Sequence, residues 1–195
     1  MRQAMKTENI KQMVQVLWLG FWGVAMLLGL MVGNASALEA SSKEEAIKMV
    51  FAGADKIVKK RIRLSTPQRA AIGKLITQTV RDKTMSFYIG KKGGQSMGFA
   101  VMESVKNRSW TMRYIVVMNT DGSVKDVDVL ELEGPRGNWG IQHSSWLDQF
   151  SGMKADSDFR SINAINGAFV SSRTIRAGVR KAVSAYQVIF IDKVK

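Results

Sequence analysis

The sequence predicts an α+β fold in which an antiparallel β-meander sheet is packed with N-terminal and C-terminal helices. Two observations lead to this fold class. Four short segments rich in β-branched and aromatic residues follow one another between residues 84 and 132, with turn signals between them. Segments with apolar residues at helical spacing stand before and after this block. Successive strands with short connections pair as antiparallel neighbours, and the flanking helices then cover the sheet.

Residues 1–37 are interpreted as an export signal. Basic residues precede an uncharged apolar run from Val16 to Val32, and the small residues Ala35-Ser36-Ala37 follow at the spacing that a signal peptidase reads. The same run is long enough to just span a bilayer, so an uncleaved membrane anchor is the alternative. In both cases the remainder of the chain is expected in the periplasm or another extracytoplasmic space.

Residues 38–83 are predicted to form an N-terminal helical segment. Two overlapping capping boxes lie between Ser41 and Glu45, and apolar residues follow at helical spacing. These apolar residues are Ile47, Val50, Phe51, Ala54, Ile57 and Val58. The pattern predicts one amphipathic helix over residues 43–60.

A second helix is expected to begin at Thr66-Pro67. Threonine is a favoured N-cap residue, and proline is favoured at the first helical position because its missing N–H has no helical partner there. This helix is expected to end near Val80.

Residues 84–195 are predicted to form the α+β domain, which begins with four strands. The expected strands are Thr84–Ile89, Met97–Val105, Trp110–Met118 and Val124–Leu132. Turn signals at residues 90–94, 106–108 and 119–122 separate them. In the last strand, Val124, Asp126, Asp128 and Leu130 alternate against Val127, Val129 and Leu132. This period-two pattern is typical of a strand with one solvent-exposed face.

A closing helix is expected after the stretch Ser161–Arg173, with Ser171 or Ser172 as its N-cap. The apolar residues that indicate it are Ile175, Val179, Ala182, Val183, Tyr186 and Val188 to Phe190. A tight Gly167-Ala168 turn leads into this helix. Backbone N–H groups at such a helix start are free to bind an anion or a phosphate, with the positive end of the helix dipole behind them.

The glycine-punctuated loop over residues 133–140 carries a cation and an aromatic ring. Trp139 can stack on a planar ring, and Arg136 can pair with a phosphate. The alternative is a well-packed loop in which Trp139 serves as a hydrophobic plug.

Composition excludes several classes of chemistry. The chain has no cysteine, which excludes disulfides, Fe–S clusters and cysteine nucleophiles. Its single histidine, His143, excludes a multi-histidine metal cluster. No Ser-His-Asp or paired-carboxylate arrangement has a recognisable setting, so a hydrolase has no support. Chemistry in this protein therefore requires a bound organic cofactor.

The net charge of +13 ordinarily indicates a nucleic-acid partner. Export argues against nucleic acid here. Acidic proteins or the anionic membrane surface are the better candidates for a partner, and the alternative is that the charge serves solubility alone.

Seven segments, taken in their order and spacing, carry a resemblance that spans roughly Glu44 to Phe190. They are Phe51–Asp55, Leu64–Arg69, Gly98–Val101, Asp121–Val124 leading into Val127–Glu133, Pro135–Gly137, Trp146 to Phe150, and Ile165–Ser172. In this respect the chain resembles the FMN-binding domain family, the extracytoplasmic flavin domains related to the G and C subunits of Rnf and Na⁺-pumping NADH:quinone oxidoreductase complexes. The resemblance implies FMN as cofactor and electron relay at the outer membrane face. It also implies membrane-bound redox proteins or cytochromes as partners.

The chain departs from the flavin-attachment motif of this family. Many members esterify the FMN phosphate to the threonine of a D-x-x-S-G-A-T motif. Here Asn163 stands in place of the aspartate, Asn166 in place of the serine and Phe169 in place of the acceptor threonine. Because a phenyl ring has no hydroxyl, we expect non-covalent rather than covalent FMN.

Three hypotheses follow from the resemblance. In the first, a non-covalent FMN module holds the phosphate with Gly167, Ala168, Ser171 and Ser172, beside Asn166, while Arg136 neutralises the phosphate charge and Trp139 or Phe169 stacks near the flavin ring. In the second, a cofactor-free degenerate paralogue acts as a basic interaction or assembly subunit of a redox complex. In the third, the protein is a basic exported module that binds some other anion.

Overall fold

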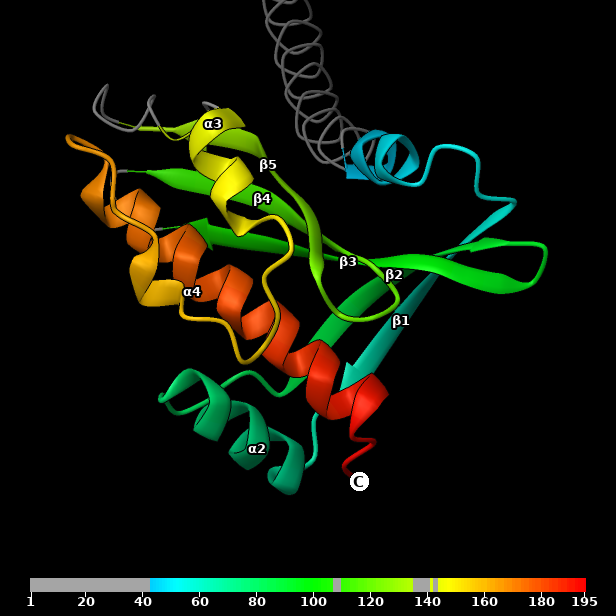
Figure 1. Cartoon of the computed structure of the whole chain (residues 1–195). Coiled ribbons are helices and arrows are strands. Elements are labelled where there is room, and N and C mark those ends of the chain that lie inside the picture. The colour runs from blue at the N-terminus through cyan, green and yellow to red at the C-terminus, as the bar shows by residue number, and fades with distance from the viewer. Residues whose placement is uncertain (1–42, 107–109, 135–140, 142–143) are drawn as a thin grey trace, which may run out of the picture. The chain divides into compact units, whose positions relative to one another are not determined.

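A computed structural model describes residues 43–106, 110–134, 141 and 144–195 (Figure 1). The chain divides into two units after Ala46, and the second unit, Ile47–Lys195, contains the sheet and the helices that cover it. The expected export signal at residues 1–37 lies outside the described residues, as do Arg136 and Trp139. None of the helices in the described ranges has the length and apolar character needed to span a bilayer.

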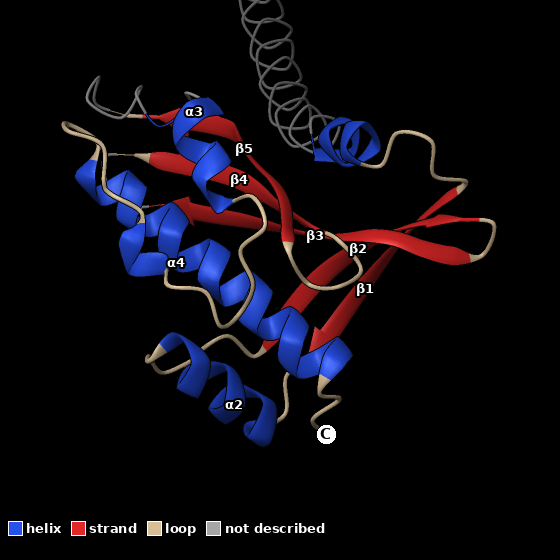
Figure 2. Cartoon of the chain, viewed as in Figure 1, coloured by secondary structure: helices blue, strands red, loops and turns tan. Residues whose placement is uncertain are grey.

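Five antiparallel strands form one sheet, in the order in which they occur along the chain (Figure 2). They are β1 (Lys56–Arg63), β2 (Thr84–Lys92), β3 (Gln95–Lys106), β4 (Thr111–Met118) and β5 (Val124–Glu133). The four strands predicted from the sequence are therefore present, and the α+β class is confirmed. The β2–β3 hairpin turns at Gly93 and Gly94, whose φ angles of 56° and 81° suit glycine.

The helix predicted over residues 43–60 is wrong in its second half. The helix covers residues 43–50, and Gly53 then takes a φ of 85°, a left-handed conformation that ends it. The Asp55 carboxylate accepts a hydrogen bond from the Gly93 N–H at 2.6 Å and so fixes the start of β1 beside the hairpin turn. β1 is an edge strand in which five of eight residues are lysine or arginine. Its residues Ile57 and Ile62 pack against opposite faces of the sheet.

The second predicted helix is present as α2 (Thr66–Ile76), with its boundaries shifted. Ser65, not Thr66, is the N-cap: its hydroxyl accepts from the Gln68 N–H, and the Gln68 side chain accepts from the Ser65 N–H, which completes a capping box. The helix ends before Val80 because Thr77 adopts a left-handed φ of 59°.

Three helices, α2, α3 (Ser144–Leu147) and α4 (Phe169–Tyr186), lie on one face of the sheet (Figures 1 and 2). The strands alternate as expected. On β4, Tyr114 and Val116 face these helices, whereas Ile115 and Val117 face the opposite side. The main hydrophobic core therefore lies between the sheet and the three helices.

A smaller apolar cluster covers part of the opposite face. Ile47 and Phe51 pack there against Ala100, Ile115 and Val117. The Phe51 ring lies directly over Gly90, where a Cβ atom would overlap the ring. Gly90, which we expected in a turn, is thus an interior residue of β2 that makes room for an aromatic ring.

The predicted wet face of the last strand needs one correction. Val124 lies in the main core with Val127, although the alternation placed it with Asp126 and Asp128. The register between β4 and β5 shifts at Val117/Met118, and such a bulge turns the residues beyond it to the other face.

Gly178 lets α4 approach the sheet closely. A Cβ atom at this position would overlap the hydroxyl and the ring carbons of Tyr114 on β4. Tyr114 is 1% exposed. Burial, with a smaller contribution from Glu103, raises the pKa of Tyr114 far above its ordinary value, so the hydroxyl stays protonated.

An aromatic cluster fixes the other end of α4. Tyr186 and Phe190 pack against Phe99 of β3, with ring centroids 4.8 and 5.0 Å from that ring. The Tyr186 hydroxyl donates to the Thr120 carbonyl at 2.7 Å. The last turns of the chain are thereby attached to the β4–β5 turn and to the sheet.

We predict that Gly178→Ala destabilises the protein by about 1–3 kcal/mol, because the added methyl group overpacks against Tyr114. Chemical denaturation measures this loss. In a Tyr114→Ala background the same substitution should cost less, since the overlapping ring is gone. A gain of about 1 kcal/mol in the wild-type background, the usual result for glycine-to-alanine within an exposed helix, would contradict the packing argument.

Candidate functional site

The loop that leads into α4 is held from two sides. Trp146, which lies in the core as an edge-on partner of Phe150, donates from its ring N–H to the Asn163 carbonyl at 2.7 Å. Within the loop the Ala168 N–H donates to the Ile165 carbonyl at 3.0 Å. The turn thus closes just before the helix begins.

The predicted N-cap of the closing helix is wrong. Ala168 is the N-cap and offers no side-chain hydrogen bond, while Ser171 and Ser172 lie buried inside the first turn of α4. The Ser172 hydroxyl accepts from the Ile165 N–H at 3.1 Å and donates to the Ala168 carbonyl at 2.8 Å. The helix begins earlier than expected because this hydroxyl binds the incoming loop from within the helix.

The exposed side of this helix start carries an aromatic ring. Phe169 is 58% exposed and its neighbour Val170 is 60% exposed, both unusual for large apolar side chains. The Arg173 guanidinium lies 5.0 Å from the centroid of the Phe169 ring, a cation–π contact. Asn166 and Gly167 are exposed beside it.

The described structure therefore separates the predicted site residues into two groups. Asn166, Gly167 and Phe169 face solvent at the start of α4, whereas Ala168, Ser171 and Ser172 are buried. The exposed group offers a planar apolar surface next to a cation, an arrangement suited to a planar anionic ligand.

Comparison with known proteins finds sequence similarity to two subunits of ion-translocating oxidoreductase complexes. No family model matches the chain. It is 21% identical over 118 residues to the G subunit of the Na⁺-translocating ferredoxin:NAD⁺ oxidoreductase complex of Acetobacterium woodii, covering 54% of the chain and 57% of the relative. It is 26% identical over 106 residues to the G subunit of the proton-translocating complex of Clostridium ljungdahlii, covering 50% and 57%. The chain thus spans little more than half the length of these relatives.

A solved structure shares the fold. The crystal structure of Shewanella oneidensis NqrC aligns with a TM-score of 0.51 over 75% of this chain and 87% of NqrC, at 15% identity. The chain is thus similar in sequence to the G subunits of these complexes and shares the fold of NqrC. The resemblance inferred from its sequence segments is confirmed.

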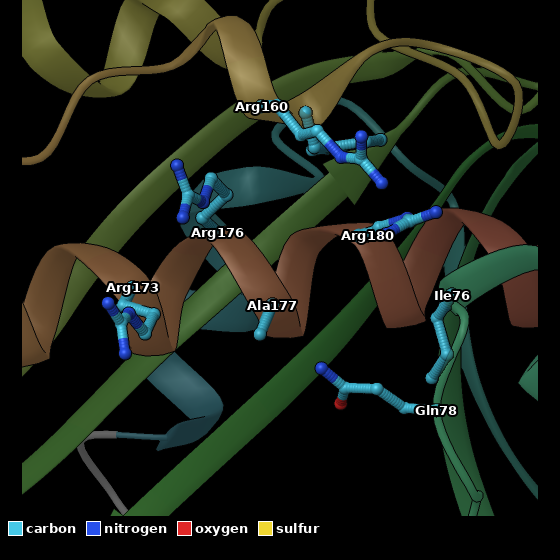
Figure 3. A pocket seen from close by; sticks show the side chains of 8 residues that line it. Ile76, Gln78, Arg160, Arg173, Arg176, Ala177 and Arg180 are labelled. Carbon is cyan, nitrogen blue, oxygen red and sulfur yellow. The ribbon is translucent and has the colours of Figure 1, made fainter.

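The structure has a second feature that sequence reasoning missed (Figure 3). A groove with a cavity volume of about 210 Å³ lies beside α4, and four arginines line it. Its lining residues are Ile76, Gln78, Phe159, Arg160, Arg173, Arg176, Ala177 and Arg180. The spacing of Arg173, Arg176 and Arg180 places them along one side of a helix and could have indicated a charged stripe. Arg160 comes from a separate element, the 3₁₀ helix η3 (Phe159–Ser161), and no helical spacing relates it to the arginines of α4.

We predict that Ser172→Ala lowers the free energy of unfolding of this domain by about 1 kcal/mol, because the Ile165 N–H loses its acceptor. Thr174→Ala is the matched control. The Thr174 hydroxyl also donates to a carbonyl four residues back, at 2.8 Å, but it lies at an exposed position and bonds only within the helix among the described residues. Chemical denaturation of both variants measures the difference. Equal losses in the two variants would refute a special role for Ser172.

Proposed function

We propose that this protein is an exported electron-transfer module that binds FMN without a covalent bond. The observation that carries the proposal is the exposed Phe169 ring with Arg173 beside it, at the position where the resemblance places the flavin acceptor. FMN has the complementary parts, namely a planar ring system and a phosphate.

The residues present fit a non-covalent flavin better than an esterified one. Phe169 provides a ring face for stacking and has no hydroxyl. The Ser172 hydroxyl is engaged in two hydrogen bonds, and Ser171 is 1% exposed. Neither serine presents an exposed nucleophile for a phosphoester bond. Gly167, with its φ of 82°, leaves the backbone before α4 accessible to a phosphate.

Bound FMN would supply the electron transfer itself, which is the chemistry of the flavin rather than of protein side chains. The protein's own task is to bind and orient the ring and to set the local charge. Arg173 contributes a cation beside Phe169, which favours an anionic ligand there. In this proposal Arg136 and Trp139, which lie outside the described residues, complete the phosphate and ring contacts.

We further propose that the protein works outside the cytoplasm with a membrane-bound redox partner, such as a cytochrome. The relatives are named as subunits of ion-translocating ferredoxin:NAD⁺ oxidoreductase complexes. Export rests on the apolar run and on the Ala35-Ser36-Ala37 site. The basic character of the chain also favours contact with an anionic membrane surface.

A second candidate is a cofactor-free assembly subunit of such a complex. The burial of Ser171 and Ser172 favours it, because two of the expected phosphate ligands face the protein interior. In that case Phe169 and Val170 form a small apolar contact for a partner protein.

A visible spectrum and an intact mass, measured on the chain after export alongside a flavin transferase, separate these proposals. We expect flavin absorbance with an unmodified protein mass. A mass increased by one esterified FMN would refute non-covalent binding. Absence of flavin, even after incubation with excess FMN, would favour the cofactor-free subunit.

We predict that Phe169→Ala weakens FMN binding about tenfold, a loss of ~1.4 kcal/mol, by removing the stacking surface. Val170→Ala is the matched control, since Val170 is adjacent and equally exposed. Titration of each variant with FMN, followed by flavin fluorescence, gives the two affinities. If both variants bind like the wild type, the flavin does not stack on Phe169.

A further inference from the structure

The groove beside α4, here called the arginine groove, is lined by four arginines and by no aspartate or glutamate among the described residues. Its four charged lining residues are Arg160 from η3 and Arg173, Arg176 and Arg180 from α4, and the other four are neutral (Figure 3). Like charges three and four residues apart on a helix repel each other and destabilise it. The arrangement therefore has a cost to the free protein that an anion in the groove would offset.

Two of these arginines also have a structural task. Arg176 donates to the Ile162 carbonyl at 2.8 Å, and Arg180 donates to the Leu75 carbonyl at 2.6 Å. Each bond uses one terminal nitrogen of a guanidinium that carries five N–H donors. These contacts hold α4 against its neighbours and fix the two side chains in the groove.

The remaining donors are largely unused within the described part of the chain. The side chains of Arg160 and Arg173 form no hydrogen bond or ion pair there, apart from the contact of Arg173 with the Phe169 ring. The Arg180 Nε is buried and has no hydrogen-bond partner among the described residues. An unsatisfied buried donor is costly, and an acceptor in the groove would remove that cost.

The next cation on α4 shows the contrast. Lys181 forms ion pairs with Glu103 at 3.0 Å and with Asp82 at 3.1 Å. Burial disfavours its charged form, but the two carboxylates outweigh this penalty and raise the Lys181 pKa above its ordinary value. Lys181 thus has two acidic partners. The groove arginines, in contrast, form no ion pair with a described residue.

From these observations we propose that the groove binds a phosphate-bearing ligand. Arginine binds phosphate oxygens in bidentate fashion, and a phosphate has enough acceptor oxygens to join guanidiniums from two elements. The groove is concave and small, which suits a compact anionic group more than a flat protein surface. Ile76, Phe159 and Ala177 provide an apolar wall for the carbon part of a phosphate ester. Arg173 is shared with the proposed flavin contact, whereas Arg160, Arg176 and Arg180 have no part in it, so the groove is tested without flavin.

Isothermal titration of the full chain with inorganic pyrophosphate, in phosphate-free buffer with mild detergent, tests the proposal. The double variant Arg160→Gln/Arg173→Gln should raise the dissociation constant at least tenfold, since it removes two groove cations that donate no hydrogen bond to a described residue. The matched control is Arg61→Gln/Arg63→Gln, which removes the same charge from exposed positions of β1 and should change the constant less than twofold. Circular dichroism confirms that both variants are folded.

A second titration with dihexanoyl phosphatidylglycerol distinguishes a lipid headgroup from a free phosphate. If pyrophosphate binds and only the groove variant loses it, the ligand is a soluble phosphate compound. If only the short-chain lipid binds, with the same dependence on Arg160 and Arg173, the ligand is a lipid headgroup. If neither probe binds, or if both double variants weaken binding equally, the proposal is overturned.

Discussion

The close approach of α4 to β4 determines how the helices are arranged on their face of the sheet. Gly178 has no side chain, so the helix lies directly on Tyr114, and any larger residue would push it outward. Its 18 residues span about 27 Å. One rigid element therefore carries the exposed Phe169 at its first turn, the groove arginines along its middle and Tyr186 at its end. A shift of the helix would displace all three together.

Sequence patterns predicted four of the five strands because each of these four carries its own local signal. Alternation and turn residues are properties of short segments, and they identified four strands within a few residues of their observed ends. The first strand was not predicted, because most of its side chains are cationic and hide the alternating pattern of a strand. Its contacts to the two apolar clusters come from Ile57 and Ile62. Gly53, which ends the preceding helix, was the signal that could have corrected this error.

The candidate site was less predictable because its contacts join a helix to the loop and the 3₁₀ helix that precede it. The start of α4 depends on a hydrogen bond between Ser172 and Ile165 that side-chain capping rules do not include. The groove depends on Arg160 meeting α4 from a separate 3₁₀ helix. The resemblance drew attention to Phe169, and the structure places it as the first residue of α4 and adds its exposure and its cationic neighbour.

The cationic edge strand has a consequence for self-association. An unpaired strand edge presents N–H and C=O groups to which another copy of the same strand can bind. In β1 the exposed lysines and arginines make such pairing between two copies unfavourable, because like charges would meet along the whole strand. Lys59 and Lys60 in addition lie over the rings of Tyr88 and Phe190, so the stems of these side chains shield apolar surface beside the edge. β1, the strand that sequence patterns missed, thus protects the edge of the sheet against pairing with another copy of the chain.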